Sequence, residues 1–371
     1  MSITVANVPF DNRAAGEGEE GHSTPVGGGN SPFCFLPTAN KPYTEEGEEG
    51  LVYSGVWRFN SRLKGKLLGM RVLIGGGSGF VGRELTRLLR DKGHEVTLIS
   101  RQPGPGKITW GELESQGLPP CEGAVNLAGE NLMNPLRWWN ESYKKDLFSS
   151  RVDTTKALSR AIAASSSPPH SWVLVSGVAC YKPSLTAQYT EDSEWTPFDL
   201  LSRLVKDWEA AALLPENVAK TTKQVIIRPG VVLGRDGGAM KQMLLPFWLG
   251  LGGTLGSGRQ PFPWIHVSDL AGIIVHALEP PADTPPSSSP QVFNGVAPPL
   301  NTNYEFTKEL GRVLGRPTIL PVPGFVMNAL LGLERAVVLT QGQKVIPKRT
   351  LESGFQYNYP DLTSALKEIV S

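Results

Sequence analysis

A glycine-rich turn at residues 75–82, Gly-Gly-Gly-Ser-Gly-Phe-Val-Gly, constrains the fold of this chain more than any other feature. A short apolar run at residues 71–74 precedes it, and residues 80–91 have the apolar spacing of a helix. Glycines at such a junction allow a tight turn, let backbone N–H groups approach a pyrophosphate, and let the helix pack closely on the sheet. This context predicts a dinucleotide-binding βαβ unit. The residues expected at the cofactor are Gly76, Gly77, Ser78, Gly79, Phe80, Val81 and Gly82.

The end of the second strand, expected over residues 95–100, selects between two cofactors. NAD-binding proteins carry a carboxylate there for the ribose 2′-hydroxyl, whereas this chain has Ser100 and Arg101, with Lys107 nearby. A guanidinium pairs with a 2′-phosphate through charge-assisted hydrogen bonds, which a carboxylate would repel. The sequence therefore predicts NADP rather than NAD, with Ser100 and Arg101 as contacts. The alternative for Arg101 is a solvated surface cation.

Strand and helix patterns alternate from Met70 onward. Short β-rich runs recur near residues 124–127, 172–176, 224–228 and 291–294. Helical stretches lie between them at roughly 138–164, 198–213 and 268–278. This alternation predicts an α/β fold built on a doubly wound parallel Rossmann sheet.

The expected organisation has three parts. Residues 1–69 carry acidic glycine clusters and little hydrophobic periodicity, which predicts a disordered N-terminal leader. Residues 70–235 form the Rossmann domain, to which residues 264–296 return. Residues 236–371 mainly form a small C-terminal substrate lobe over the carboxyl edge of the sheet, where open α/β folds bind ligands.

Composition excludes several classes of partner. The net charge of +1 provides no global field for nucleic acid or anionic membrane. The longest uncharged stretches are short and broken by Gly or Pro, so no membrane span is expected. Three cysteines without CxxC spacing favour a reducing compartment and no metal site. We expect an intracellular, first of all cytoplasmic, protein with a small-molecule substrate. Mitochondrial and nuclear locations and the oligomeric state stay open.

Four motifs together resemble one superfamily. Besides the glycine turn, they are Asn-Leu-Ala-Gly at 126–129, Arg-Pro-Gly-Val-Val-Leu-Gly at 228–234 and Trp-Ile-His-Val-Ser-Asp-Leu at 264–270. The pattern is similar to the atypical or extended short-chain dehydrogenase/reductases, in their nucleoside-diphosphate-sugar-epimerase-like branch. Members of this branch are described as epimerase family proteins or NADP-dependent oxidoreductases. The resemblance extends from Met70 to about Val370.

The resemblance implies further cofactor contacts. It places Leu127, Ala128 and Gly129 against the nicotinamide-side ribose, because small residues there let the cofactor pass. It also places Asp146 and Arg151, on the following helix, and Pro229 near the cofactor. For Asp146 and Arg151, the alternative is an exposed pair of helical charges.

The catalytic residues match the family pattern less well. Active members of the superfamily use a Ser or Thr after the fifth strand and a Tyr-x-x-x-Lys on the next helix, where the Tyr exchanges a proton with the substrate oxygen. Ser176 occupies the expected neighbourhood and Tyr181 follows five residues later, but residues 198–209 contain no Tyr. Ser176 and Tyr181 are therefore the catalytic candidates. The alternative for Tyr181 is a packing residue beside the cofactor pocket.

Three other residues bear on chemistry. His266 is either a second acid or a loop histidine held by Asp269. Arg228 either binds an anionic group or pairs with a nearby carboxylate. Val231 stands where sugar-nucleotide epimerases direct an Asn toward substrate, and its side chain cannot replace an amide's donor and acceptor.

Three functions follow from these patterns. The first is an NADP-dependent oxidoreductase acting on an unidentified small carbonyl or alcohol. The second is an NADP(H)-binding sensor or scaffold without catalysis, which the missing Tyr-x-x-x-Lys favours. The third is a nucleotide-sugar epimerase, which Val231 disfavours.

Overall fold

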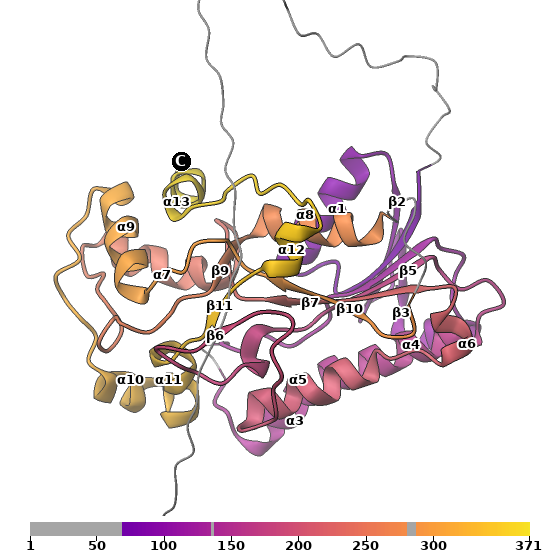
Figure 1. Ribbon diagram of the computed structural model, residues 1–371, viewed down its shortest axis with the longest axis horizontal. Helices are drawn as coiled ribbons and strands as arrows, with labels where there is room; N and C mark the ends of the chain where they lie inside the picture. The colour runs from indigo at the N-terminus through magenta and orange to yellow at the C-terminus, as the bar shows by residue number, and fades with distance from the viewer. Residues whose placement is uncertain (1–68, 135–136, 280–286) are drawn as a thin grey trace, which may run out of the picture. The chain divides into compact units, whose positions relative to one another are not determined.

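Parallel strands form a seven-stranded central sheet in the computed structural model (Figure 1). In spatial order they are β10 (Gln291–Gly295), β7 (Lys223–Pro229), β5 (Ser171–Val175), β4 (Gly123–Asn126), β1 (Arg71–Gly75), β2 (Glu95–Ser100) and β3 (Lys107–Thr109). The chain runs from β1 to β3 in one direction and from β4 to β10 in the other. The order therefore reverses between β1 and β4, the place where open α/β sheets bind ligands. The predicted doubly wound parallel sheet is confirmed.

The structure describes residues 69–134, 137–279 and 287–371. The expectation of a disordered leader falls, except for its last residue, outside the described residues. None of the described helices combines the length and apolar character that a membrane crossing requires. The boundary drawn between a Rossmann domain and a substrate lobe stays a prediction.

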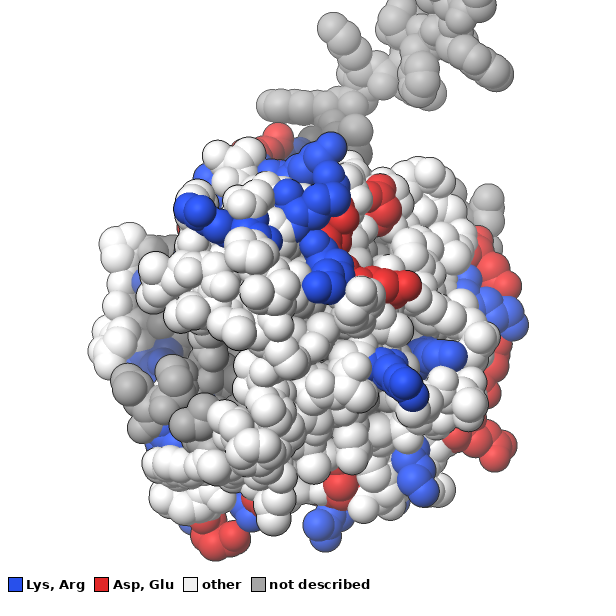
Figure 2. Space-filling model, turned by 90° about the vertical axis from the view of Figure 1, so that its left-hand side faces the viewer, with Lys and Arg blue, Asp and Glu red and all other residues white. Residues whose placement is uncertain are grey.

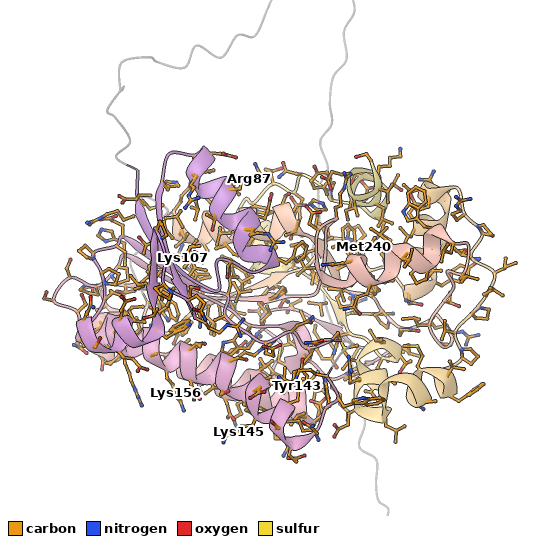
Figure 3. The ribbon with its side chains drawn as sticks, turned by 180° about the vertical axis from the view of Figure 1, so that it is seen from behind. Arg87, Lys107, Tyr143, Lys145, Lys156 and Met240 are labelled. Carbon is orange, nitrogen blue, oxygen red and sulfur yellow. The ribbon has the colours of Figure 1, made fainter. Side chains whose placement is uncertain are left out.

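Helices cover both faces of the sheet. One face carries α1 (Phe80–Asp91) and α8 (Val267–Leu278); the other carries α2 (Trp110–Gln116), α4 (Thr154–Ala164) and α5 (Leu200–Ala211), with the short α6 (Glu216–Ala219) beside them. Figure 3 shows Arg87 on α1 on one side of the sheet and Lys156 on α4 on the other. A parallel sheet covered on both faces needs apolar residues on both, and β1 satisfies this requirement. Val72 and Ile74 pack toward α1 and α8, while Leu73 packs toward the opposite layer.

The helix expected over residues 138–164 is divided by a change in its hydrogen bonding. It begins as α3 (Glu141–Phe148), passes through one π-helical turn at Ser149–Asp153 and continues as α4. Asn140 caps its start by accepting a hydrogen bond from the backbone N–H of Tyr143. Such π turns occur often at functional sites, and this one contains Arg151.

The C-terminal part builds a second apolar core. It is formed by β8 (Val231–Leu233), β9 (Trp264–His266), α7 (Gly238–Trp248), α9 (Asn303–Leu314) and α13 (Leu362–Val370). Fully buried side chains there include Met240, Trp264, Phe306 and Leu366. The remaining elements are α10 (Gly324–Leu331), α11 (Leu333–Thr340), α12 (Lys348–Glu352) and β11 (Lys344–Val345), which pairs with β6 (Gln188–Tyr189). Figure 1 shows α7, α9, α10 and α11 gathered at one end of the sheet.

The surface at this end of the sheet has wide areas with few charged side chains (Figure 2). Exposed apolar side chains come from α7 and the loop after it, and from residues 319–333. They include Leu245, Trp248, Leu249, Ile319, Phe325 and Leu333. These side chains make this end of the molecule the part of the described surface where exposed apolar residues gather.

Phe80, the first residue of α1, joins the glycine turn to this second core. Its ring lies against three glycines: a Cβ at Gly237 would stand 2.4 Å from Phe80 Cδ2, one at Gly234 2.8 Å from its Cζ, and one at Gly238 3.0 Å from its Cε1. Side chains at these positions would overlap the ring. Gly234, Gly237 and Gly238, where the chain passes from β8 into α7, therefore leave the space that the Phe80 ring fills.

We predict that Gly237→Ala lowers the free energy of unfolding by about 1–3 kcal/mol, because the new methyl group must displace the Phe80 ring. Urea denaturation followed by circular dichroism measures the change. Gly111→Ala is the matched control, since its Cβ would have its nearest neighbour at 4.0 Å in helix α2. This control should be neutral or stabilising by up to ~1 kcal/mol. Equal changes in the free energy of unfolding of the two variants would show that the Phe80 ring does not depend on glycine at position 237.

Candidate functional site

The turn after β1 takes its shape from close backbone contacts. Gly76 has φ +75°, and a Cβ there would lie 2.7 Å from the backbone N of Ala128. A Cβ at Gly82 would lie 2.5 Å from Gly76 O, and one at Gly77 2.4 Å from Leu98 Cδ2. The turn is closed by a hydrogen bond from Gly79 N–H to Gly76 O of 3.0 Å. Gly76 is the most restricted, because its φ is positive and its neighbour is the backbone after β4. A Cβ at Gly77 would have to displace the Leu98 side chain, and one at Gly82 the backbone of the turn itself.

The start of α1 has no side-chain cap. Gly79 is the N-cap residue and contributes no side-chain hydrogen bond. The backbone N–H groups of the first turn are therefore available to an anion, which the helix dipole also favours. Gly76, Gly77, Ser78 and Gly79 lie in this turn, and Phe80, Val81 and Gly82 are the first residues of α1. The cofactor contacts expected of these seven residues stay predictions.

Ser100 and Arg101 lie at the same edge of the sheet, one strand away. Gly75 pairs in register with Ile99, so the end of β2 stands beside the glycine turn. Ser100 Oγ accepts a hydrogen bond from Gln102 N–H at 3.2 Å. Arg101 is exposed and forms no hydrogen bond or ion pair with any residue that the structure describes. This guanidinium is therefore available to a ligand at the turn.

Asn126 holds the end of β4 against the turn. Its side chain is fully buried; Oδ1 accepts from Ala128 N–H at 3.0 Å, and Nδ2 donates to Thr155 Oγ1 at 2.8 Å. Leu127 N–H donates to Gly75 O at 2.8 Å. Leu127 and Ala128 are thus fixed beside the glycine turn by backbone contacts. The sequence contained a signal for Asn126, a polar residue ending an apolar strand, but its anchoring role was not predicted.

Arg151 lies under Gly129, where a Cβ would stand 3.0 Å from the guanidinium carbon. Its Nη2 donates to Glu130 O at 2.9 Å, and its guanidinium lies over the Trp208 ring, 5.2 Å from the centroid. Burial lowers the pKa of Arg151 to about 10, which leaves it charged at neutral pH. Its charge is thus held inside the protein, next to Gly129.

Asp146 lies apart from Arg151. Its carboxylate is about half exposed and pairs with Arg137 at 2.9 Å. The two residues expected together near the cofactor therefore face different surroundings, because a separation of five residues turns them to different sides of the helix. Pro229 is the last residue of β7, opposite Gly295 of β10 in register. The cofactor contacts expected of Asp146, Arg151 and Pro229 stay predictions.

Ser176 and Tyr181 belong to one buried polar network. Ser176 Oγ donates to Glu209 Oε1 at 2.8 Å. Arg228 donates two hydrogen bonds of 2.8 Å to the same carboxylate and a third, from Nη1, to Tyr181 Oη at 3.0 Å. Tyr181 Oη also lies 3.0 Å from Asn294 Oδ1. Arg228 thus pairs with a carboxylate, one of the two interpretations its sequence position allowed.

Tyr181 is fully buried, and its ring stacks on Tyr189 at a centroid distance of 5.1 Å. Burial raises its pKa to about 12 even though the Arg228 guanidinium acts in the opposite direction. A phenol in this state gives up its proton reluctantly and has no surface for a substrate. The position resembles the packing role more than the catalytic one. The catalytic roles of Ser176 and Tyr181 stay predictions.

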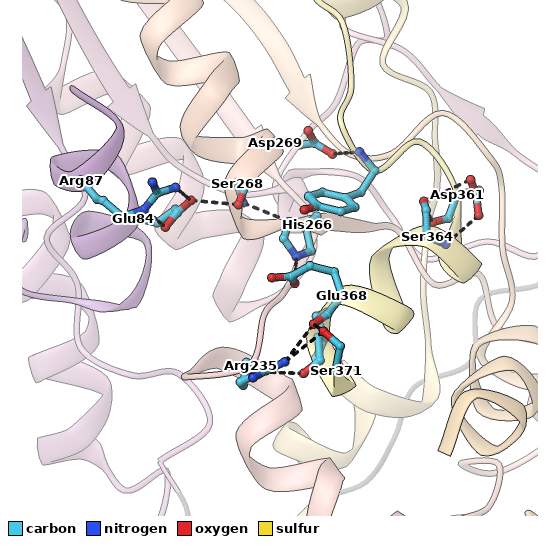
Figure 4. A network of polar contacts seen from close by, with 12 residues as sticks. Glu84, Arg87, Arg235, His266, Ser268, Asp269, Asp361, Ser364, Glu368 and Ser371 are labelled. Atoms are coloured by element: carbon cyan, nitrogen blue, oxygen red, sulfur yellow. Dashed lines mark hydrogen bonds and ion pairs between the residues drawn. The ribbon is translucent and has the colours of Figure 1, made fainter. Parts of the chain in front are cut away.

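His266 is held by a partner other than the one expected. Its Nε2 lies 3.0 Å from Glu368 Oε2 on α13, and its Nδ1 accepts from Ser268 N–H at 3.2 Å (Figure 4). Asp269 instead accepts hydrogen bonds from the backbone N–H groups of Asn358 and Tyr359. The expected His266–Asp269 contact is therefore wrong, because a residue 102 positions away in sequence packs against the ring. Within the described ranges, no cluster of three or more His, Cys, Asp or Glu forms a potential metal site.

Sheet order, glycine turn and helix N-terminus together define a Rossmann-type α/β protein. A family model described as the NAD dependent epimerase/dehydratase family matches residues 72–294, and one described as a domain of unknown function matches residues 322–369. The chain belongs to the NAD dependent epimerase/dehydratase family. The predicted resemblance is thereby confirmed.

Known proteins support this assignment. The chain is 58% identical over 302 residues to epimerase family protein SDR39U1 of Homo sapiens, covering 81% of this chain and 100% of that protein. A crystal structure of human SDR39U1 (isoform 2) with NADPH shares 57% identity with a TM-score of 0.77, covering 81% of this chain and 99% of that one. A nucleoside-diphosphate sugar epimerase from Corynebacterium glutamicum shares 26% identity with a TM-score of 0.63, covering 81% of this chain and 58% of that one.

We predict that Glu209→Gln lowers the free energy of unfolding by about 3–5 kcal/mol, because it leaves the Arg228 guanidinium buried without a counter-charge. Urea denaturation measures the loss. Glu216→Gln is the control, since Glu216 pairs with Lys220 on an exposed helix surface. Breaking that pair should cost less than ~1 kcal/mol. A small effect of Glu209→Gln would show that the network contributes little to stability.

Proposed function

We propose that this protein is an NADPH-dependent oxidoreductase that acts on a small carbonyl or alcohol. The observation that carries the proposal is Arg101, an exposed guanidinium at the end of β2 beside the glycine turn. A 2′-phosphate would neutralise it, whereas the 2′-hydroxyl of NADH would leave it unpaired. The NADPH in the human relative's crystal structure supports the same cofactor.

The residues around the glycine turn match successive parts of NADPH. The free N–H groups at the start of α1 would bind the pyrophosphate, and Arg101 would bind the 2′-phosphate. Ala128 and Gly129 would leave room for the nicotinamide-side ribose, with Arg151 fixing Gly129 from behind. When bound, the cofactor would supply a hydride to a carbonyl carbon. The substrate oxygen then needs a proton, and the family's usual Tyr-Lys pair is missing from the sequence.

A second function, an NADPH-binding sensor or scaffold without catalysis, is favoured by Tyr181. Its hydroxyl is fully buried and already bonded to Arg228 and Asn294. Ser176 is likewise turned toward Glu209. A nucleotide-sugar epimerase is the third candidate. Val231 lends it no support, because its side chain is apolar and its N–H is used in a hydrogen bond to Pro263 O.

We predict that NADPH binds more tightly than NADH and that Arg101→Ala removes this preference. The loss of one charge-assisted contact should weaken NADPH binding roughly ten- to a hundredfold and leave NADH binding unchanged. Isothermal titration calorimetry measures both affinities. Arg90→Ala serves as the control, because Arg90 is an exposed residue near the far end of α1. Equal affinities for the two cofactors in the unaltered protein would overturn the cofactor assignment.

A second prediction separates the oxidoreductase from the sensor. A panel of aldehydes and ketones, followed by NADPH absorbance, should contain at least one substrate. Tyr181→Phe keeps the packing of the ring and removes only its hydroxyl, and Ser176→Ala removes the other candidate. If Tyr181 acts through the network alone, Tyr181→Phe should retain turnover while the unfolding midpoint falls. Tight NADPH binding without turnover of any compound would favour the sensor.

A further inference from the structure

The segment that leaves β4 is held along its backbone by side chains. We define the β4–α3 segment as residues 127–134 and 137–140. Side-chain donors reach the carbonyl oxygens of five consecutive residues, 130 to 134, and of Arg137. A loop usually leaves its carbonyls to solvent, so such a row indicates a conformation that several elements jointly specify.

The donors come from both parts of the molecule. Arg151 and Tyr143, from the helix after the segment, donate to Glu130 O and Asn131 O, and Trp139 donates to Leu132 O. Gln242 of α7 donates to Met133 O at 3.2 Å. Arg335 of α11 donates at 3.0 Å to both Asn134 O and Arg137 O.

Arg335 is the donor that makes two hydrogen bonds with this segment. Its side chain is only 4% exposed, and both terminal nitrogens are used on the β4–α3 segment. No ion pair joins it to a carboxylate among the described residues, and its Nε is buried without a hydrogen-bond partner there. A guanidinium buried against backbone carbonyls alone loses its hydration without gaining a counter-charge, which costs free energy. Charge neutralisation therefore does not explain this contact.

Glu334, the preceding residue, fixes the same helix to α3. Its carboxylate lies 3.0 Å from Lys144 Nζ. Glu334 and Arg335 thus attach α11 to α3 and to the segment in front of α3. Both belong to residues 322–369, which match the family model described as a domain of unknown function.

The segment begins at the residues proposed to border the cofactor. Ala128 touches the glycine turn, Gly129 rests on Arg151, and the next carbonyl, that of Glu130, accepts from Arg151. Gly129 lies five positions before Asn134 along this backbone, and the carbonyls of residues 130 to 134 all accept side-chain donors. These contacts connect α11 to the residues proposed to border the nicotinamide.

We propose that Arg335 is a positioning residue: through Asn134 and Arg137 it fixes the wall of the cofactor and substrate site, and this is a task of the 322–369 segment. Gln242 assists from α7. The proposal rests on the proposed binding of NADPH for one of its two readouts. Its other readout, backbone exchange in the segment, does not depend on any ligand.

The test uses the full chain with Arg335→Met, Arg335→Lys and Gln242→Ala. Arg335→Met keeps the length of the apolar stem but removes the guanidinium donors from Asn134 O and Arg137 O, while Asn134 O keeps its hydrogen bond from Arg137 N–H. We expect amide hydrogen exchange in residues 130–134 to accelerate roughly tenfold and NADPH affinity to fall roughly three- to tenfold. Arg335→Lys retains the charge without the fork and should recover only part of both effects. Gln242→Ala, at an exposed position, should change both in the same direction by less.

A charge exchange tests the same link without a buried substitution. Lys144→Glu and Glu334→Lys should each weaken NADPH binding by roughly two- to fivefold. The double variant should restore part of it, because the carboxylate at position 144 then faces Glu141, which pairs with Lys144 at 3.4 Å. Arg312→Gln is the control, because Arg312 pairs with Glu309 within α9.

The outcomes separate the two proposals. Failure of the unaltered protein to bind NADPH would overturn the proposed function, while the exchange data would still test the positioning. A lower unfolding midpoint in Arg335→Met, with unchanged exchange in residues 130–134 and unchanged NADPH affinity, would show that Arg335 serves stability only. That result would overturn the inference.

Discussion

The site depends on the approach of one backbone turn to the end of a neighbouring strand. The turn after β1 and the end of β4 meet so closely that no Cβ fits at Gly76, and Asn126 holds Ala128 in place from within the sheet. Backbone atoms and one buried amide therefore set the distance between the turn and the end of β4. Arg101 on one side and Gly129 on the other are each a strand end away from this contact. Their positions relative to this contact therefore follow from the register of the strands.

The parts of the fold that local patterns describe could be predicted from the sequence. The longer strands of the sheet are apolar runs, and the crossover helices show apolar residues at helical spacing. The doubly wound fold class was therefore predictable. The three-residue edge strand β3 and helix α2 were not, because Lys107–Thr109 contributes only one aliphatic side chain. The two-stranded pairs β6–β11 and β8–β9 were also missed, since segments distant in the chain form them.

Contacts between distant residues explain what was missed in the site. Glu209 looks like a surface charge on an amphipathic helix until β7 brings Arg228 beside it. Asp269 was the nearest candidate partner for His266 along the chain, but Glu368 reaches the ring instead. Glycines behaved differently: their positions in the turn could be predicted because the motif between a strand and a helix is local in sequence, although Ala128 and Leu98, which lie against Gly76 and Gly77, are distant in the chain. Residues whose role depends on a partner across the fold could only be named as alternatives.

The position of α13, which contains Glu368, also determines when the second core can form during synthesis. The sheet strands β1 to β5 pair with neighbours close in sequence, so their contacts can form early during synthesis. The second core cannot, because Leu366 and Ile369 pack with Leu233 and Trp264, more than a hundred residues earlier. Synthesis reaches Leu366 more than a hundred residues after Trp264. A nascent chain therefore carries a largely assembled sheet with an unfinished second core until α13 has emerged, and this exposed apolar surface is what a chaperone would meet first.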